Sequence, residues 1–236
     1  MSDTVTTEIR DRIAITTIAN GKANVLSPEV VAALDEALTA AELAGDDVGA
    51  MVIAGTPGFL SGGFDLSVMM SSLDAAGALV SAGGAFFTRC FASELPVIGA
   101  CTGHAVAAGA LLLLACDERI GAEGNFKIGL IETAKGMVLP RWAVELAEER
   151  LSRRHFQVAT VGARMYGPSD ARDAGYLDEV VAPDAVIERA IEVAKVWAEL
   201  PRAAYKGQVT MNRGERIRRL EAAIEADRGR GFAVGT

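Results

Sequence analysis

Two stretches rich in glycine and alanine could present backbone N–H groups to a bound anion. The first covers residues 56–66 after a strand-like segment, and the second covers residues 97–117. Small side chains at the start of a helix leave N–H groups accessible, and the helix dipole favours negative charge there. The second stretch alone is equally compatible with close packing in a core. Together, two such turns could direct two N–H groups at one oxygen atom, which is the construction of an oxyanion hole.

Three motifs that include these turns resemble the crotonase family, the superfamily of enoyl-CoA hydratases and isomerases. They are FLSGGFDL at residues 59–66, ACTGHAVAAG followed by ACDERI at 100–120, and FKIGLIE at 126–132. Their order and spacing match the family, and the resemblance covers roughly residues 8–200. It implies an α/β fold, a crotonase-like β/α spiral of repeated ββα units with a C-terminal helical trimerisation region. It also implies an acyl-CoA substrate and a homotrimer, or a hexamer formed by two trimers.

The resemblance places the catalytic chemistry on one carboxylate and two N–H groups. Glu132 matches the family's base, and the N–H groups of Phe64 and Ala108 match the donors of the oxyanion hole. Removing a proton next to a thioester needs a base in reach and donors about 3 Å from the oxygen that becomes negative. The hydratases of the family use a second glutamate, whose position is occupied here by Leu111. Leucine followed by a single glutamate resembles the 3,2-enoyl-CoA isomerases.

We therefore expect an enzyme that moves a double bond from the 3 to the 2 position of an enoyl-CoA in fatty-acid metabolism. Glu132 would remove the proton at C2 and return it at C4. Two alternatives remain open, a 2-enoyl-CoA hydratase and a non-catalytic acyl-CoA-binding protein. Two departures from the family pattern bear on this choice. Leu111 replaces the first glutamate of the hydratases, and Ile131 stands where asparagine or proline is usual.

Further positions are carried over from the family as contacts to CoA or to the acyl group. In the family, the loop before the first long helix holds the adenine end of CoA, largely through its backbone. A solvent-exposed lysine is an equally good interpretation of Lys22. Met137 and Trp142 are candidates for the acyl-facing wall or for the core, and Arg228 and Arg230 could reach the CoA phosphates. The binding positions are Lys22, Ala23, Val25, Leu26, Gly63, Asp65, Leu66 and Leu111.

Composition limits the remaining functional classes. The chain has 236 residues, half of them hydrophobic, which is enough for one large core. The net charge of −8 argues against a nucleic-acid-binding protein, although a few local cations could still bind an anionic CoA. No secretion signal opens the chain, and its longest apolar run is too short to span a bilayer, so we expect a cytoplasmic protein that does not bind membranes.

The three cysteines show no metal-ligand spacing and are interpreted as reduced, buried side chains. We expect neither a metal site nor a permanently bound cofactor, because CoA enters as part of the substrate. His104 follows a strand and is expected to be a turn residue bonded to the backbone, with no catalytic role.

Strands and helices must position these groups, and the sequence shows strand and helix patterns in alternation. Their recurrence predicts a stacked β/α spiral. We expect a core of residues 1–195 and a helical region of residues 196–236. Ser27 and Pro28 are the start signals of an amphipathic helix reaching residue 44. Gly77, Gly83 and Gly84 predict that residues 68–89 form no single long helix and are mobile. Strands are expected at residues 5–9, 13–18, 50–54, 97–101, 115–122 and 176–181, and further helices at residues 110–116, 141–150, 152–161, from 168, and from 183 onward.

Overall fold

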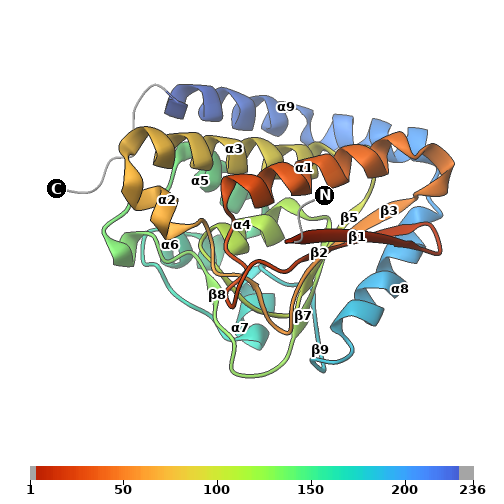
Figure 1. Cartoon of the computed structure of the whole chain (residues 1–236), viewed down its shortest axis with the longest axis horizontal. Helices are drawn as coiled ribbons and strands as arrows, with labels where there is room; N and C mark the ends of the chain where they lie inside the picture. Colours follow the sequence, from red (N-terminus) through yellow and green to blue (C-terminus); the bar gives the residue numbers. More distant parts are fainter. Residues whose placement is uncertain (1–3, 229–236) are drawn as a thin grey trace.

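The structure is a computed structural model that describes residues 4–228, and two β-sheets organise it (Figure 1). The larger sheet has six strands in the order β1-β2-β3-β5-β7-β9, and the smaller has three in the order β4-β6-β8. Every strand pair is parallel except the opening hairpin of β1 and β2. The α/β class and the spiral of repeated units are therefore confirmed.

The central strands of the large sheet are buried on both faces, as their apolar sequences require, whereas the edge strand β1 is largely exposed. Along β3, Met51 and Ile53 belong to one hydrophobic cluster, whereas Ala50, Val52 and Ala54 belong to the other. This alternation follows from the two-residue period of a strand. The strands are β1 (Val5–Arg10), β2 (Ile13–Ile18), β3 (Ala50–Gly55), β5 (Val97–Cys101), β7 (Glu118–Ala122) and β9 (Glu179–Val181), close to the predicted segments.

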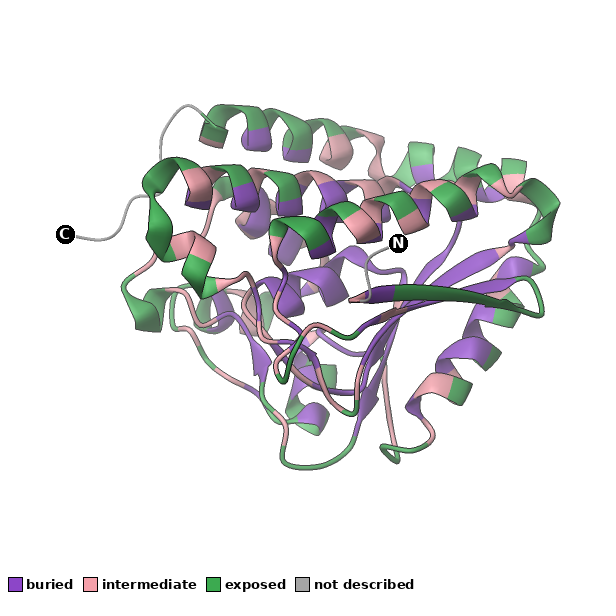
Figure 2. Ribbon diagram, viewed as in Figure 1, coloured by how far each residue is buried: buried purple, intermediate pink, exposed green. Residues whose placement is uncertain are grey.

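Long helices cover the two faces of this sheet. α8 (Val186–Ala198) contacts β2, β3, β5 and β7 and supplies one of the two clusters. On the other side, α1 (Pro28–Leu43), α3 (Leu73–Ala92) and α9 (Arg202–Arg228) lie side by side (Figure 1). Between them and the sheet, α4 (Ala108–Ala115) is buried along its whole length (Figure 2).

The start of α1 follows the predicted capping signals. The hydroxyl of Ser27 accepts a hydrogen bond from the Val30 N–H at 3.3 Å, and Pro28 is the first helical residue. The remaining helices are α2 (Leu66–Ser71), α5 (Arg141–Arg150), α6 (Arg153–Thr160), α7 (Pro168–Ala174) and the two 3₁₀ turns η1 (Gly45–Asp47) and η2 (Thr133–Lys135).

The C-terminal helices share the core of the rest of the chain. Leu220, Ala223 and Ile224 of α9 belong to the same cluster as the buried residues of α3, α4 and α5. The boundary expected between residues 195 and 196 falls inside α8.

The smaller sheet was not predicted from the sequence, which indicated loops or turns at two of its strands. It contains β4 (Gly58–Ser61), β6 (Gly103–Val106) and the two-residue β8 (Ile128–Gly129). A Cβ on Gly103 would lie 2.1 Å from the carbonyl carbon of Gly58, so only glycine permits this pairing. Glycine has a low intrinsic propensity for β-strands. Here the close approach of two backbones outweighs that low propensity. The chain thus passes from β3 to β4, from β5 to β6 and from β7 to β8.

The prediction that glycines interrupt residues 68–89 was wrong, because α3 is one helix of 20 residues. A Cβ on Gly83 would lie 2.3 Å from Cζ of Phe64, and one on Gly84 would lie 2.7 Å from Cε2 of Trp142. The two glycines make room for aromatic rings. Each glycine destabilises a helix by about 1 kcal/mol relative to alanine, and burial of one helix face outweighs this cost. Residues 73–92 therefore form one packed helix, preceded by the short α2.

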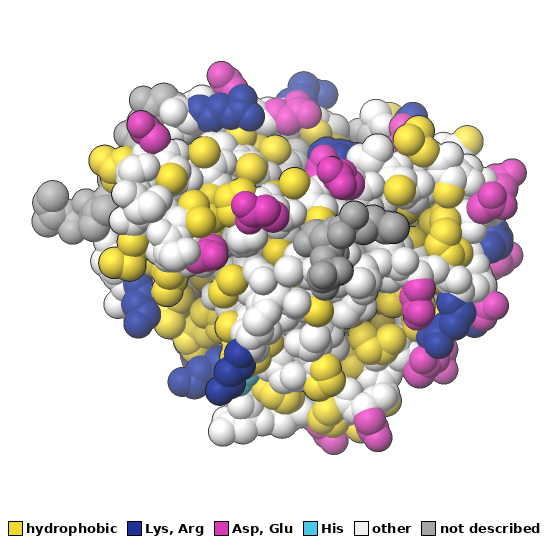
Figure 3. All heavy atoms as spheres, in the orientation of Figure 1, with side chains coloured by type: hydrophobic (Ala, Val, Ile, Leu, Met, Phe, Trp, Pro, Cys, Tyr) yellow, Lys and Arg dark blue, Asp and Glu magenta, His cyan; other side chains and the backbone are white. Residues whose placement is uncertain are grey.

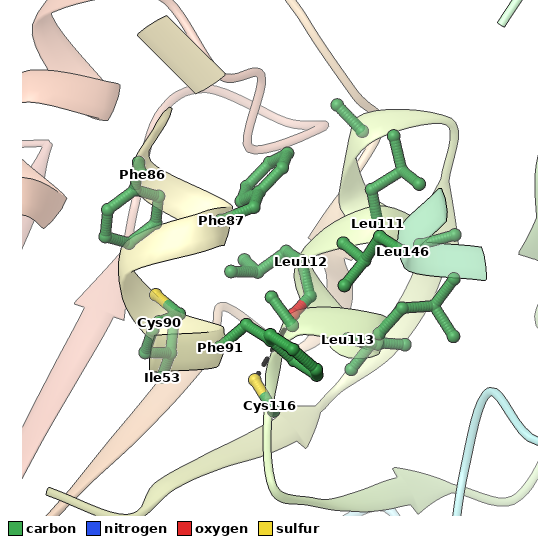
Figure 4. Close-up of a cluster of buried hydrophobic side chains, with 14 of the residues drawn as sticks. Ile53, Phe86, Phe87, Cys90, Phe91, Leu111, Leu112, Leu113, Cys116 and Leu146 are labelled. Atoms are coloured by element: carbon green, nitrogen blue, oxygen red, sulfur yellow. Dashed lines mark hydrogen bonds between the residues drawn. The ribbon is translucent and has the colours of Figure 1, made fainter. Parts of the chain in front are cut away.

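α3 is the one helix among residues 4–228 whose length and composition would allow it to cross a membrane, although 56% of that stretch is buried inside the fold. Its aromatic side chains Phe87 and Phe91 point toward the leucines of α4, and Phe86 belongs to the same hydrophobic cluster (Figure 4). Cys90 and Cys116 belong to the same core, and all three cysteines are buried and free, as predicted.

Candidate active site

The two glycine-rich turns lie directly against each other. Gly63 has a φ of +102°, and a Cβ there would lie 3.0 Å from Cβ of Ala107 and 3.4 Å from the nitrogen of Ala108. From the other side, a Cβ on Gly109 would lie 2.3 Å from the carbonyl oxygen of Ser61. The absence of side chains at residues 63 and 109 lets the two backbones touch.

Each turn contributes one backbone N–H group that is left unpaired. Ala108 is the first residue of α4, so its N–H has no intrahelical acceptor. Phe64 forms a parallel bridge with Leu26 through the Leu26 N–H to Gly63 O bond (2.8 Å) and the Asp65 N–H to Leu26 O bond (3.1 Å). This bridge does not use the Phe64 N–H. Within residues 4–228, neither of these two N–H groups has a protein acceptor, which is the condition for an oxyanion hole.

Ala107 turns the chain sharply from β6 into α4. Its φ of +54° and ψ of −122° are rare for a residue with a side chain and cost on the order of 1–3 kcal/mol. The Ala107 N–H donates to Gly129 O at 2.9 Å, and its carbonyl accepts from Ala110 and Leu111 at 2.9 and 3.1 Å. These bonds hold the strained conformation that makes the Ala108 N–H the first of the helix.

Glu132 lies just after β8 on a firmly held backbone. Its carbonyl oxygen accepts hydrogen bonds from the N–H groups of Lys135 at 2.9 Å and Met137 at 3.0 Å. The carboxyl oxygen Oε2 is enclosed and has no hydrogen-bond partner within residues 4–228. Burial raises the pKa of this carboxyl above 4.5, against the opposite effect of the nearby N–H groups of Glu132 and Ile131. A carboxylate with one enclosed oxygen that has no hydrogen-bond partner is a candidate general base.

The small sheet places the two candidate donors and the candidate base at one edge. Since β4, β6 and β8 are parallel, their carboxyl ends meet at the same edge of the sheet. β4 leads to Phe64, β6 leads to Ala108, and β8 leads to Glu132. The site is thus assembled by the three strands that sequence reasoning did not recognise as a sheet.

Leu111 is buried in α4, with only 2% of its surface exposed. It lies beside Leu146 of α5 in the aliphatic cluster (Figure 4). Its side chain offers no acid or base.

The loop expected to bind the adenine end of CoA adjoins the oxyanion-hole turn. The Gly62 N–H donates to Ala23 O at 2.7 Å, which ties this loop to the first turn. Lys22 is exposed, and Val25 and Ala23 are half-buried. Leu26 is fully buried, so its side chain belongs to the core and only its backbone lies at the turn.

Asn24 fastens this loop, and sequence reasoning gave it no role. Its side-chain N–H groups donate to the Thr56 hydroxyl at 3.0 Å and to Phe59 O at 2.9 Å, and its oxygen accepts from the Asn20 N–H at 3.1 Å. The residue is fully buried with a φ of +47°. Asparagine tolerates this left-handed conformation, so its position in a loop with Gly21 was the available signal.

Asp65 and Leu66 form the start of α2. The Asp65 carboxylate accepts from the Ser67 N–H at 2.8 Å and from its hydroxyl at 2.7 Å, and these bonds lower the pKa of Asp65. Asp65 therefore caps the helix. Leu66 is exposed, together with Met70 and Leu73, and hydrophobic side chains gather on this face over α2 and α3 (Figure 3).

Aromatic rings continue from Phe64 into the core. The Phe64 and Phe87 rings are stacked with centroids 6.3 Å apart, and Trp142 follows at 5.9 Å from Phe87. Trp142 is fully buried, and its Nε1 has no acceptor within residues 4–228. Met137 is half-buried in the loop after Glu132.

Four C-terminal arginines that the structure describes form ion pairs with acidic residues of the protein, namely Arg213, Arg216, Arg219 and Arg228. Arg213 contacts Asp117 at 2.5 Å, and Arg228 contacts Glu225 at 3.1 Å. Arg230 lies outside the described residues.

Residues 4–228 contain no group of three His, Cys, Asp or Glu side chains arranged to hold a metal ion.

Comparisons with known proteins identify the family and the fold. The family model described as "Enoyl-CoA hydratase/isomerase" matches residues 8–230. Human "Enoyl-CoA delta isomerase 1, mitochondrial" is 29% identical over 217 residues, 91% of this chain and 72% of that protein. A "Probable enoyl-CoA hydratase" of Rhizobium meliloti (strain 1021) is 28% identical over 214 residues, 89% of this chain and 82% of that protein. The crystal structure of an enoyl-CoA hydratase/isomerase family protein from Pseudomonas syringae has a TM-score of 0.94 at 40% identity, covering 97% of this chain and 98% of that one.

Proposed function

The chain belongs to the enoyl-CoA hydratase/isomerase family, and we propose that it isomerises 3-enoyl-CoA to 2-enoyl-CoA in fatty-acid metabolism with one carboxylate. The observation that carries this proposal is the enclosed Oε2 of Glu132, which has no partner within residues 4–228. A second observation supports it, since the position of the other family glutamate holds the buried Leu111.

The proposed reaction needs no atom beyond those of the substrate. The thioester oxygen accepts hydrogen bonds from the N–H groups of Phe64 and Ala108, and the Glu132 carboxylate removes a proton from C2. The electron pair of the broken C–H bond forms a dienolate, whose charge rests on the thioester oxygen. The protonated Glu132 then returns the proton at C4, and the double bond moves to C2–C3. Loss of one donor of an oxyanion hole typically lowers kcat by about 10²- to 10³-fold.

Hydration makes a different demand on the site. Adding water across C2–C3 requires activation of a water molecule and delivery of a proton to carbon, which the family's hydratases share between two glutamates. Glu132 alone can act in proton transfer, and the aliphatic Leu111 can do neither task. We therefore expect isomerisation to be the faster reaction.

The test compares two substrates on the same purified protein. With 3-enoyl-CoA we expect conversion to the conjugated 2-enoyl-CoA, and with 2-enoyl-CoA we expect little hydration. The matched control is Glu132→Gln, which keeps the shape and removes the base, so both activities should fall to background. Hydration faster than isomerisation would instead indicate a hydratase. Acyl-CoA binding with no turnover, unchanged in Glu132→Gln, would indicate a binding protein.

A further inference from the structure

His104 lies in the middle strand of the small sheet and contacts both of its neighbours. Phe59 of β4 stands opposite His104 in the strand register, with ring centroids 4.7 Å apart. Phe126, just before β8, meets the imidazole edge-to-face at 5.3 Å. The imidazole Nδ1 accepts a hydrogen bond from the Lys127 N–H at 3.0 Å. The His104 side chain on β6 thus contacts β4 on one side and the residues just before β8 on the other.

The bond to Lys127 strengthens a strand that is otherwise very short. β8 contains two residues, and a pairing of that length is marginal. The Lys127 carbonyl accepts from the Ala105 N–H at 3.1 Å, and the His104 ring engages the N–H of the same residue. Both backbone polar groups of Lys127 are therefore held by β6.

The acceptor role fixes the protonation of His104. A ring nitrogen that accepts an N–H donor carries no proton, so the neutral imidazole bears its proton on Nε2. Partial burial lowers the pKa of His104, and the positive charge of Lys127 lowers it further, which favours the neutral form. The other groups packed on the ring, Phe59 and Phe126, carry no charge. An imidazolium has two donors and no acceptor, so its formation would break the bond to the Lys127 N–H.

We propose that His104 is a positioning residue whose neutral imidazole holds β8 beside β6 and thereby sets the distance from the Glu132 carboxyl to the Ala108 N–H. Lys127 is five residues before Glu132, and His104 is four residues before Ala108. A shift between the two strands therefore moves the base relative to the oxyanion hole. The catalytic part of this inference rests on the proposed function, whereas the bond itself does not.

Two substitutions separate the acceptor from the ring. Asparagine can place its amide oxygen at the position of Nδ1, and phenylalanine keeps the ring contacts but cannot accept a hydrogen bond. For His104→Phe we expect kcat to fall by roughly 10- to 100-fold with KM nearly unchanged, since small misplacements of catalytic groups have effects of this size. His104→Asn should retain most of the wild-type kcat. Wild-type kcat in His104→Phe, or equal losses in both variants, would overturn the proposal.

A second experiment needs no turnover. The chain has two histidines, so the variant His155→Asn leaves the His104 ring as the only imidazole signal in nitrogen NMR. We expect the Nε2–H tautomer, and we expect hydrogen-exchange protection of the Lys127 amide to decrease as the ring becomes protonated in acid. A proton on Nδ1, or protection independent of that titration, would contradict the inference even if His104→Phe failed to fold.

The two experiments also separate this inference from the proposed function. Suppose that the protein is inactive on every enoyl-CoA, while the hydrogen-exchange protection of the Lys127 amide follows the titration of His104. This result would contradict the proposed function and support the hydrogen bond between His104 and Lys127. An active isomerase with a normal His104→Phe kcat would contradict the inference alone.

Discussion

A side chain on Gly63 would collide with Ala107, because its Cβ would lie only 3.0 Å from Cβ of Ala107. Gly63 precedes the candidate donor Phe64, and Ala107 precedes the candidate donor Ala108. The contact therefore sets how closely the two unpaired N–H groups approach each other. Both residues have a positive φ. Glycine adopts this conformation readily, whereas Ala107 adopts it despite its side chain.

Removing the N–H of Phe64 tests its role as a donor. Phe64→Pro removes no hydrogen bond within the protein, because this N–H has no acceptor among residues 4–228. We expect kcat for 3-enoyl-CoA isomerisation to fall by about 10²- to 10³-fold. Phe64→Ala keeps the N–H and serves as the control for loss of the ring. Equal kcat values in the two variants, with the fold checked by circular dichroism, would exclude a donor role.

The pH dependence of kcat/KM reports the protonation of Glu132. Burial raises the pKa of this carboxyl above 4.5, and only the carboxylate can remove a proton. Activity should therefore decline as the pH falls, with a midpoint above 4.5. Measurement in His104→Asn removes any contribution from the imidazole. An acid midpoint at or below 4.5 in that variant would mean that Glu132 is not the base.

The same burial makes Glu132 a source of instability at neutral pH. Since its pKa is raised in the folded state, its contribution to stability is complete below 4.5 and is lost as the pH rises through the raised pKa. Glu132→Gln should therefore be more stable than the wild type at pH 7, and the difference should shrink below pH 4.5. Urea denaturation at both pH values measures this, with the exposed Glu148→Gln as a control that should change stability little. A less stable Glu132→Gln at pH 7 would refute the expectation.

Two glycines of α3 should respond oppositely to alanine. At Gly83 a Cβ would lie 2.3 Å from the Phe64 ring, so Gly83→Ala must displace that ring and should cost about 1–3 kcal/mol of stability. Its kcat should also fall, because Phe64 carries a donor. At Gly77 no atom lies within 4 Å of the added Cβ, so Gly77→Ala should stabilise the protein by about 0.5–1 kcal/mol. Thermal melts of the two variants that shift in the same direction would contradict this account of α3.

The cysteines should be unreactive in the folded protein. Burial raises the pKa of Cys101 and of Cys116 to about 12, and it also raises the pKa of Cys90. A thiol reagent at pH 8 should label none of them until a denaturant is added. Rapid labelling of the native protein would show that the α3 and α4 core opens easily.

Sequence patterns predicted those elements whose local signals agree with their packing. The cap at Ser27 and Pro28 and the apolar strands belong to this group, and so do the two turns with small side chains. The small sheet escaped prediction because Gly58 and Gly103 pair through a close approach of backbones, which local propensity cannot indicate. The prediction that Gly83 and Gly84 interrupt a helix failed for the same reason. The rings that pack against these glycines belong to Phe64 and Trp142, which lie far away in the sequence.

Within the site, residue types identified the turns, while the arrangement of the base depended on tertiary structure. Nothing near Glu132 in the sequence indicates that its Oε2 is enclosed without a partner. His104 was expected to bond to the backbone, which the contact with the Lys127 N–H confirms. That the bond links β6 to β8 follows only from the fold, because the two residues lie 23 positions apart.

The most direct test is a crystal structure of the wild-type protein with a saturated acyl-CoA, which can bind but has no double bond to move. We expect the thioester oxygen to lie about 3 Å from the nitrogens of both Phe64 and Ala108, with the Glu132 carboxyl facing C2. A thioester oxygen bound elsewhere, or a Glu132 side chain directed away from C2, would contradict the account.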